Sequence, residues 1–294
     1  MTRPTRPAPL RETPSLVPGE PLIAFHDVRI GFDEGDVLRG ISFEVRPGET
    51  KVLLGESGSG KTLTMKLAAG LLRPDAGRIW VMGQNVAEMP EHQLLDFRRQ
   101  VGFVFQEGAL FDSLTVAENV SFRLREEDLP DDEIEERVRE VLRFVELESA
   151  IDKYPAELSG GMRRRVAIAR ALADRPPLVF YDSPTAGLDP VTSQTIITLI
   201  LRLRDLQGVT SMLATHRLQD ATGLASFRFD VETNRVVALD GNGGMPVAHR
   251  GEQEVAPATN VLVLREGRVY FEGAVDDVLR SSDDYLRKFL ASAK

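Results

Sequence analysis

Cysteine is absent from this 294-residue sequence, which excludes disulfide bonds, thiolate metal sites and a cysteine nucleophile. Histidine is scarce, and its four copies are scattered along the chain, so a zinc cluster is not expected. No apolar run approaches the ~20 residues that a membrane-spanning helix requires. We therefore expect a cytoplasmic protein that reaches a membrane only through a partner.

The charge balance is acidic, with 36 basic and 45 acidic side chains and a formal net charge of -9. An extended phosphate-neutralising surface is therefore not expected, and nucleic acid is not expected as a partner. A small phosphate ligand is compatible with this balance, because a few backbone N–H groups can bind it locally.

The first 21 residues, MTRPTRPAPLRETPSLVPGEP, are rich in proline and arginine. They lack the apolar segment of a secretory signal, so we expect an extended, disordered tail over residues 1–21. Residues 22–294 are then expected to form the folded domain.

Short β-rich stretches alternate with amphipathic helices through most of residues 22–294. This alternation predicts an α/β fold built around a mostly parallel sheet. Residues of about 99–165 have a more helical pattern and are expected to form an inserted helical subdomain. The pattern breaks down over residues of about 226–260, which we interpret either as a short hairpin or as a disordered or regulatory insertion.

A glycine-rich segment, GESGSGKT, matches the phosphate-binding pattern G-x-x-x-x-G-K-[ST]. It follows the apolar stretch KVLL and precedes a predicted helix, which is the context that the pattern requires. Glycines let successive N–H groups turn toward a phosphate, and the helix N-terminus adds partial positive charge. The candidate nucleotide-binding residues are Gly55, Glu56, Ser57, Gly58, Ser59, Gly60, Lys61 and Thr62.

A carboxylate ends a second buried stretch, LVFYD, whose last residue is Asp182. A phosphate loop requires such a carboxylate on a neighbouring strand to hold Mg²⁺, directly or through water. In this interpretation Lys61 reaches the β- and γ-phosphates, while Thr62 and Asp182 are metal ligands. The sequence therefore predicts a site for ATP and Mg²⁺.

The turn LSGGM precedes a strong helix and lies between the phosphate loop and Asp182 in the chain. A serine and two glycines at a helix N-terminus form a second anion-binding arrangement. The order of these three motifs resembles that in the ATP-binding subunits of ABC transporters. The resemblance covers residues of about 22–224 and the later stretch VLREGRVYFEG.

The resemblance implies roles for further residues. Phe32 would stack on adenine, and Gln106 would be a catalytic residue and metal ligand that senses Mg²⁺ and the attacking water. Asp189 would belong to the D-loop AGLD, and His216 would act at the γ-phosphate. Asp182 would be part of the catalytic site. The signature residues that would complete the site of a second subunit are Ser159, Gly160 and Gly161.

The same resemblance implies a P-loop NTPase core with a mostly parallel sheet, an antiparallel β edge and the inserted helical subdomain. Two subunits would pack head to tail, as a homodimer or as a heterodimer with a homologous ATPase. ATP would lie between the phosphate loop of one subunit and the LSGG turn of the other. An integral membrane permease would hold the pair, as peripheral subunits, at the inner face of the cell membrane.

A narrower resemblance lies in Met162, in the arginine-rich helix start after it, and in the stretch GALFDSLTV. These features are similar to those of the ATPases of Mla/Mce lipid transport systems. That resemblance implies transport of phospholipids or sterols with a permease and an Mce-type lipid-binding protein. A different importer or exporter remains an open alternative, and neither the substrate nor its direction of movement follows from the sequence.

Ser183 is a departure from the family, in which a glutamate follows the Mg²⁺-binding aspartate and orients or deprotonates the attacking water. Loss of a well-placed general base typically costs about 10²–10⁴-fold in rate. We favour a working transport ATPase that is slow or that positions water with Glu107 or His216. The alternative is an ATP-gated dimerisation module that hydrolyses little ATP.

A third interpretation is a soluble ABC protein that acts on ribosomes or DNA rather than in transport. Such proteins usually carry tandem ATPase domains, long coiled coils or basic extensions. This chain has one phosphate loop, no heptad run and an acidic balance, so we disfavour this class.

Overall fold

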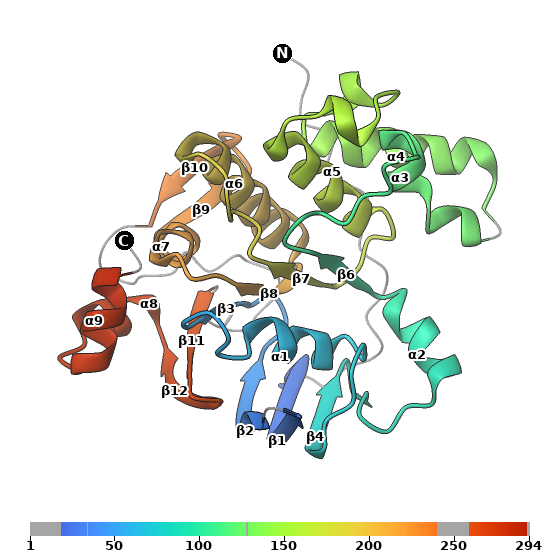
Figure 1. The fold of residues 1–294 in the computed structure, drawn as a ribbon. Helices are drawn as coiled ribbons and strands as arrows, with labels where there is room; N and C mark the ends of the chain where they lie inside the picture. Colours follow the sequence, from blue (N-terminus) through green and yellow to red (C-terminus); the bar gives the residue numbers. More distant parts are fainter. Residues whose placement is uncertain (1–18, 34, 128, 240–258, 293–294) are drawn as a thin grey trace.

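The computed structural model describes residues 19–33, 35–127, 129–239 and 259–292. A six-stranded sheet forms the centre, with strand order β12-β11-β3-β8-β7-β6 (Figure 1). All neighbouring pairs in it are parallel except β11 and β12, which are antiparallel. Its strands are β3 (Thr50–Leu54), β6 (Val101–Val104), β7 (Leu178–Asp182), β8 (Thr210–Ala214), β11 (Thr259–Arg265) and β12 (Arg268–Gly273).

A second, antiparallel sheet has the order β2-β1-β4-β5. Its strands are β1 (Ile23–Phe32), β2 (Gly35–Val45), β4 (Ala76–Val81) and β5 (Gln84–Asn85). Helix α1 (Lys61–Ala68) lies between the two sheets, and its buried Met65 and Leu67 belong to the same apolar cluster as Phe25 and Leu53 (Figure 1). The antiparallel sheet is thereby fixed to the parallel one.

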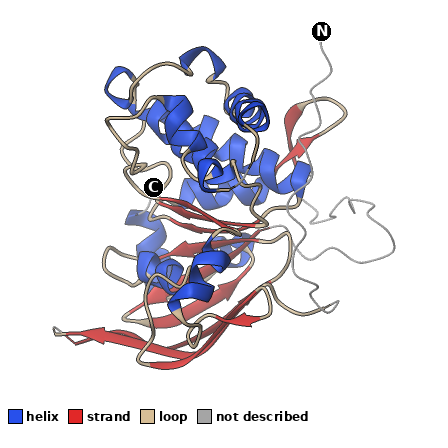
Figure 2. Cartoon of the chain, turned by 90° about the vertical axis from the view of Figure 1, so that its right-hand side faces the viewer, coloured by secondary structure: helices blue, strands red, loops and turns tan. Residues whose placement is uncertain are grey.

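The remaining helices mostly gather on the other face of the six-stranded sheet, as Figures 1 and 2 show. They are α2 (Glu91–Arg98), α3 (Val116–Ser121), α4 (Asp131–Phe144), α5 (Gly160–Leu172), α6 (Pro190–Gln207), α7 (Leu218–Ser226), α8 (Val275–Arg280) and α9 (Asp284–Ser292), with 3-10 turns at Leu124–Glu126, Glu148–Ala150 and Pro155–Glu157. Helices α3 and α4 pack on α5, which in turn packs on β6. In α4 the buried face is Ile134, Val138 and Leu142, as its 3.6-residue period predicts.

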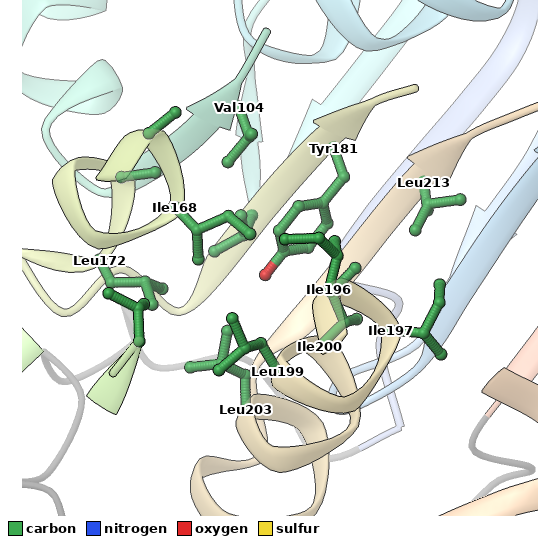
Figure 3. Packing of buried hydrophobic residues seen from close by; sticks show 14 of the residues in the cluster. Val104, Ile168, Leu172, Tyr181, Ile196, Ile197, Leu199, Ile200, Leu203 and Leu213 are labelled. Atoms are coloured by element: carbon green, nitrogen blue, oxygen red, sulfur yellow. The ribbon is translucent and has the colours of Figure 1, made fainter. Parts of the chain in front are cut away.

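The central strands are apolar along their whole length because helices or the second sheet cover both faces. Successive side chains of β7 enter opposite clusters: Val179 and Tyr181 pack with α5 and α6, whereas Leu178 and Phe180 pack on the α1 side. Figure 3 shows Tyr181 pointing into the α5–α6 cluster. Its hydroxyl has no hydrogen-bond partner, and burial raises the pKa of the Tyr181 phenol. The Tyr181 side chain is therefore held by packing alone, next to Asp182 on the same strand.

The predicted α/β fold with a mostly parallel sheet and an antiparallel edge is confirmed. The apolar stretch VGFVF has the pattern of a buried strand, and Val101–Val104 is a strand of the central sheet, so the helices within residues 99–165 begin after it. This strand pairs with β7, although the two lie far apart in the chain.

Residues of the irregular segment partly form a hairpin, β9 (Phe227–Asp230) and β10 (Arg235–Ala238), which are antiparallel. The rest of that segment, 240–258, and nearly all of the predicted tail, 1–18, lie outside the described residues. No helix in the described part of the chain has both the length and the hydrophobicity needed to cross a membrane.

Candidate nucleotide site

The candidate site lies along one edge of the central sheet. The strands β3, β6, β7 and β8 are parallel, so the segments that follow them emerge at the same edge. The segments are the phosphate loop after β3, Gln106 after β6, Ser183 after β7 and His216 after β8. Residues that are far apart in the sequence therefore gather at the carboxyl ends of neighbouring strands.

The phosphate loop requires glycine at specific positions. Gly55, Gly58 and Gly60 have φ values of 151°, 79° and 98°, in the range that favours glycine. A Cβ atom on Gly55 would lie 2.5 Å from the carbonyl oxygen of Leu264 and 2.6 Å from Ser59 Oγ. The loop is therefore closely packed against β11, and its turn tolerates no side chain at Gly55.

Lys61 closes the phosphate loop. Its Nζ donates to the carbonyl oxygens of Gly55 at 2.8 Å and Glu56 at 2.7 Å, and to Ser59 Oγ at 3.4 Å. Burial lowers the pKa of the Lys61 ammonium, while the nearby charges of Asp182 and Glu56 oppose that shift. A cation is thus held over the loop, at the N-terminus of α1, where the helix dipole also favours an anion.

Asp182 meets the phosphate loop through Thr62. Thr62 Oγ1 donates to Asp182 Oδ1 at 3.0 Å, although 120 residues separate them in the chain. Asp182 is 6% exposed and reaches across the end of β8, which lies between β7 and β3. Mg²⁺ takes oxygen ligands at about 2.0–2.1 Å in octahedral geometry, so neighbouring ligands lie about 2.9 Å apart. The two oxygens therefore fit a pair of Mg²⁺ ligands.

Ser183 occupies the left-handed region, with φ 49°. Its N–H donates to the carbonyl oxygen of Ala214 at 2.9 Å, which ties the end of β7 to the end of β8. Its hydroxyl donates to Asp182 Oδ1 at 3.5 Å, the weakest contact of the site. The side chain thus lies beside the candidate metal ligand and offers no carboxylate of its own.

Gln106 and His216 are both exposed at this edge. The backbone just before Gln106 is fixed by the buried Arg164, whose Nη1 donates to the carbonyl oxygen of Phe105 at 2.9 Å. The sequence interpretation missed Arg164, because one arginine in the run RRR has no distinguishing pattern. The roles of Gln106 and His216 stay predictions.

The signature turn and the D-loop lie side by side. Ser159 Oγ accepts from the N–H of Met162 at 3.2 Å and caps α5, while Asp189 caps α6 by accepting from the N–H of Thr192 at 3.0 Å. A Cβ atom on Gly161 would lie 2.3 Å from Thr192 Cγ2, and one on Gly160 would contact Leu188. The glycines therefore allow two helix N-termini to approach closely. Ser159, Gly160 and Asp189 are exposed.

Two features of the surroundings bear on nucleotide recognition. Phe32, the candidate adenine-stacking residue, ends β1 and is 56% exposed.

A cavity of about 1040 Å³ flanks the phosphate loop on its β11 side, and its walls include Arg265 and Tyr285. The Arg265 guanidinium lies 4.1 Å from the centre of the Tyr285 ring. No pattern in the sequence indicated this cavity, because α9 and the β11–β12 turn meet only in the folded chain.

A family model described as ABC transporter matches residues 38–186, half of the chain. The chain belongs to the ABC transporter family. The matched range contains the phosphate loop, Gln106, the LSGGM turn and Asp182, whereas Phe32, Asp189 and His216 lie outside it.

Relatives with transport functions in their names share much of the sequence. The methionine import ATP-binding protein MetN of Thermobifida fusca is 42% identical over 208 residues, which cover 69% of this chain and 65% of that protein. The intermembrane phospholipid transport system ATP-binding protein MlaF of Haemophilus influenzae is 35% identical over 210 residues, covering 70% of this chain and 80% of that protein. The chain therefore spans less than two thirds of the length of this MetN relative.

A solved structure of similar fold is the ATP-binding cassette MJ0796, described as a dimer in a post-hydrolysis state bound to ADP and Pi. It is 27% identical, with a TM-score of 0.69, and the match covers 86% of this chain and 98% of that one. The predicted P-loop ATPase fold of the ABC type is thereby confirmed.

Proposed function

We propose that this cassette is the ATPase subunit of a membrane transporter, in which Mg-ATP binding and hydrolysis drive a partner permease. The observation that supports this proposal best is the hydrogen bond of Thr62 to Asp182, which brings two oxygen ligands to the phosphate loop. Lys61, at the same loop, provides the positive charge that a triphosphate requires.

The proposed roles follow from the positions of the side chains. Lys61 binds the β- and γ-phosphates, and Thr62 and Asp182 hold Mg²⁺, with Gln106 as a further ligand. When bound, Mg²⁺ would neutralise charge on the phosphate oxygens. His216 contacts the γ-phosphate from the end of β8, and Phe32 stacks on adenine. The residues of the loop thereby orient ATP for attack by water.

We propose that the working unit is a dimer, as a homodimer or with a homologous ATPase. Ser159, Gly160 and Asp189 are exposed, and they lie at the N-termini of α5 and α6, which lie side by side. The dimeric state described for MJ0796 supports this arrangement. The signature of one subunit then completes the phosphate site of the other, so dimer closure depends on ATP.

The proposed cargo is a lipid, a phospholipid or sterol, transported with an Mce-type lipid-binding protein. Support comes from Met162, from the stretch GALFDSLTV and from the similarity to MlaF. Methionine import is a second candidate, supported by the similarity to MetN. In either case the subunit would lie at the inner face of the membrane, held there by the permease.

Ser183 provides the test of hydrolysis. We expect the wild-type subunit with its permease to hydrolyse ATP faster than the Lys61→Ala variant does. Because Ser183 supplies no base, Ser183→Glu should raise the rate by a further ~10-fold or more. The measurement is phosphate release at saturating Mg-ATP. If the wild type only equals the Lys61→Ala background while Ser183→Glu is active, the chain is an ATP-gated dimerisation module.

Phe111 provides the test of permease docking. Phe111 and Phe122 are 44% and 40% exposed, and their ring centres lie 4.6 Å apart. Buried Asn119 holds this surface in place, since it bonds both the N–H and the carbonyl oxygen of Phe111. Phe111→Asp should abolish co-purification with the permease, because a charge would enter an apolar contact.

The matched control for docking is Leu279→Asp. Leu279 is also exposed, at 43%, but it lies on α8, far from α3 in Figure 1. This variant should co-purify as the wild type does. Undiminished recovery of the permease with Phe111→Asp would contradict the docking surface.

A further inference from the structure

A buried carboxylate lies directly behind the candidate site and has no part in the roles described above. Asp220, on the first turn of α7, is 2% exposed. Its Oδ2 atom accepts two short hydrogen bonds, from Thr185 Oγ1 at 2.7 Å and from Thr215 Oγ1 at 2.6 Å. Both threonines are buried as well. One oxygen therefore joins the loop after β7 to the loop after β8, which are far apart in the sequence.

Those two loops carry the candidate catalytic residues. Thr185 follows Ser183 by two positions and directly precedes the D-loop, residues 186–189. Thr215 directly precedes His216, and its N–H donates to the carbonyl oxygen of Leu53, on the strand that leads into the phosphate loop. The Asp220 carboxylate is thus the junction between the loop after β7 and the loop after β8.

Arg217 strengthens the same junction. Its Nη1 donates to the carbonyl oxygen of Thr185 at 3.1 Å and to Ser193 Oγ on α6 at 2.9 Å. Thr185 is therefore held at its hydroxyl by Asp220 and at its carbonyl by Arg217, the neighbour of His216. Displacement of the D-loop would have to break these bonds or move the His216 turn with it.

The chemistry of the junction favours a rigid connection. A buried carboxylate is costly unless hydrogen bonds replace its hydration, and bonds to an ionised acceptor are about twice as strong as neutral ones. Both threonine hydroxyls must donate to Asp220, so neither can donate elsewhere. A valine at either position would fill almost the same volume, but it would remove one of the two donors to the buried carboxylate, whereas serine would keep it. Packing and coupling can therefore be separated by experiment.

We propose that Asp220, together with Arg217, is a positioning residue that couples the D-loop to the switch residue His216. A shift of the D-loop on contact with a second subunit is thereby transmitted to the side chain at the γ-phosphate. This inference rests on the proposed function, because it assumes that ATP reacts in a site completed by a second subunit. Asp220 itself touches no substrate.

The experiment compares Thr185→Val with Thr185→Ser, which differ in the hydroxyl that Asp220 accepts. With Mg-ATP as substrate, Thr185→Val should lower kcat by roughly 10-fold or more and leave KM within about 3-fold, because orientation is lost and binding is kept. Thr185→Ser should restore kcat. The control is Thr222→Val, which removes a threonine hydroxyl from α7, the helix that carries Asp220. That hydroxyl bonds the carbonyl oxygens of Leu218 and Gln219, so this variant should behave as the wild type.

A second measurement does not depend on hydrolysis. Amide hydrogen exchange should become faster at residues 215–217 in Thr185→Val, although the substitution lies in the other loop. Thr185→Ser and Thr222→Val should keep the wild-type exchange rates there.

The outcomes separate the two proposals. Wild-type hydrolysis no faster than that of Lys61→Ala would reject the transport ATPase, and the exchange measurement would then decide the coupling by itself. Unchanged exchange at residues 215–217, or equal behaviour of the valine and serine variants, would overturn the coupling. A rise in KM, a fall in kcat and a loss of thermal stability in the same variant would show that Asp220 has a structural role only. That result would also overturn the proposed coupling.

Discussion

Replacing Lys61 with alanine should lower ATP hydrolysis at least about 100-fold, the size of effect seen when one group that stabilises transition-state charge is removed. The ammonium lies within 2.8 Å of two carbonyl oxygens of the loop, and in the proposed function its charge stabilises the phosphates that the loop binds. Alanine removes that charge and leaves those carbonyls without their donor. The affinity for ATP should fall as well, because the ground state also carries the phosphate charge.

The measurement is twofold: phosphate release by the subunit with its permease, and binding of a fluorescent ATP analogue to the subunit alone. Lys66→Ala is the matched control, since Lys66 lies on the same helix but outside the loop. It should bind and hydrolyse ATP as the wild type does. Equal loss in both variants would point to damage of α1 rather than to removal of a phosphate ligand.

Replacing Asp182 with asparagine should lower hydrolysis by about 10²–10³-fold and raise the Mg²⁺ concentration needed for half-maximal rate. The amide keeps the shape of the side chain and can still accept from Thr62, so the contact at 3.0 Å can persist. It loses the negative charge that a divalent cation requires. The expected defect is therefore in the binding of Mg²⁺ and not in the stability of the fold.

Rates measured over a series of Mg²⁺ concentrations test this prediction, with thermal unfolding as a check on stability. The control is Asp152→Asn, which removes an exposed carboxylate outside the site. If Asp182→Asn shows an unaltered Mg²⁺ dependence, Asp182 does not hold the metal.

The candidate site was largely predictable because its chemistry is local in sequence. The run GESGSGKT and the flanking apolar stretch predicted a strand, a loop and a helix, and β3 and α1 lie where that pattern places them. The contact of Thr62 with Asp182 followed from what a phosphate loop requires, despite the long separation. Glycine positions with positive φ explain why the motif tolerates little variation.

The features that escaped prediction depend on contacts between distant segments. Asp220 in LQDATG looks like any acidic residue on the first turn of a helix, and nothing in the sequence places two threonine hydroxyls beside it. Likewise, β6 could be recognised as a strand, but its place at the edge of the sheet beside β7 depends on pairing. Pattern gives the type of an element, whereas its neighbours are decided by packing of the whole chain.

The strand β3, which leads into the phosphate loop, pairs with two strands, β8 and β11, that are synthesised after it. Opposite Thr50 lie Ser211 on β8 and Thr259 on β11, both much further along the chain. A ribosome delivers the N-terminus first, so β3 cannot form either of these pairings until β8 and β11 have been made. Pairings between distant segments are also slow, because a long loop must close before the contacts form. The strand that carries the phosphate loop is therefore completed only when segments made long after the loop have folded against it.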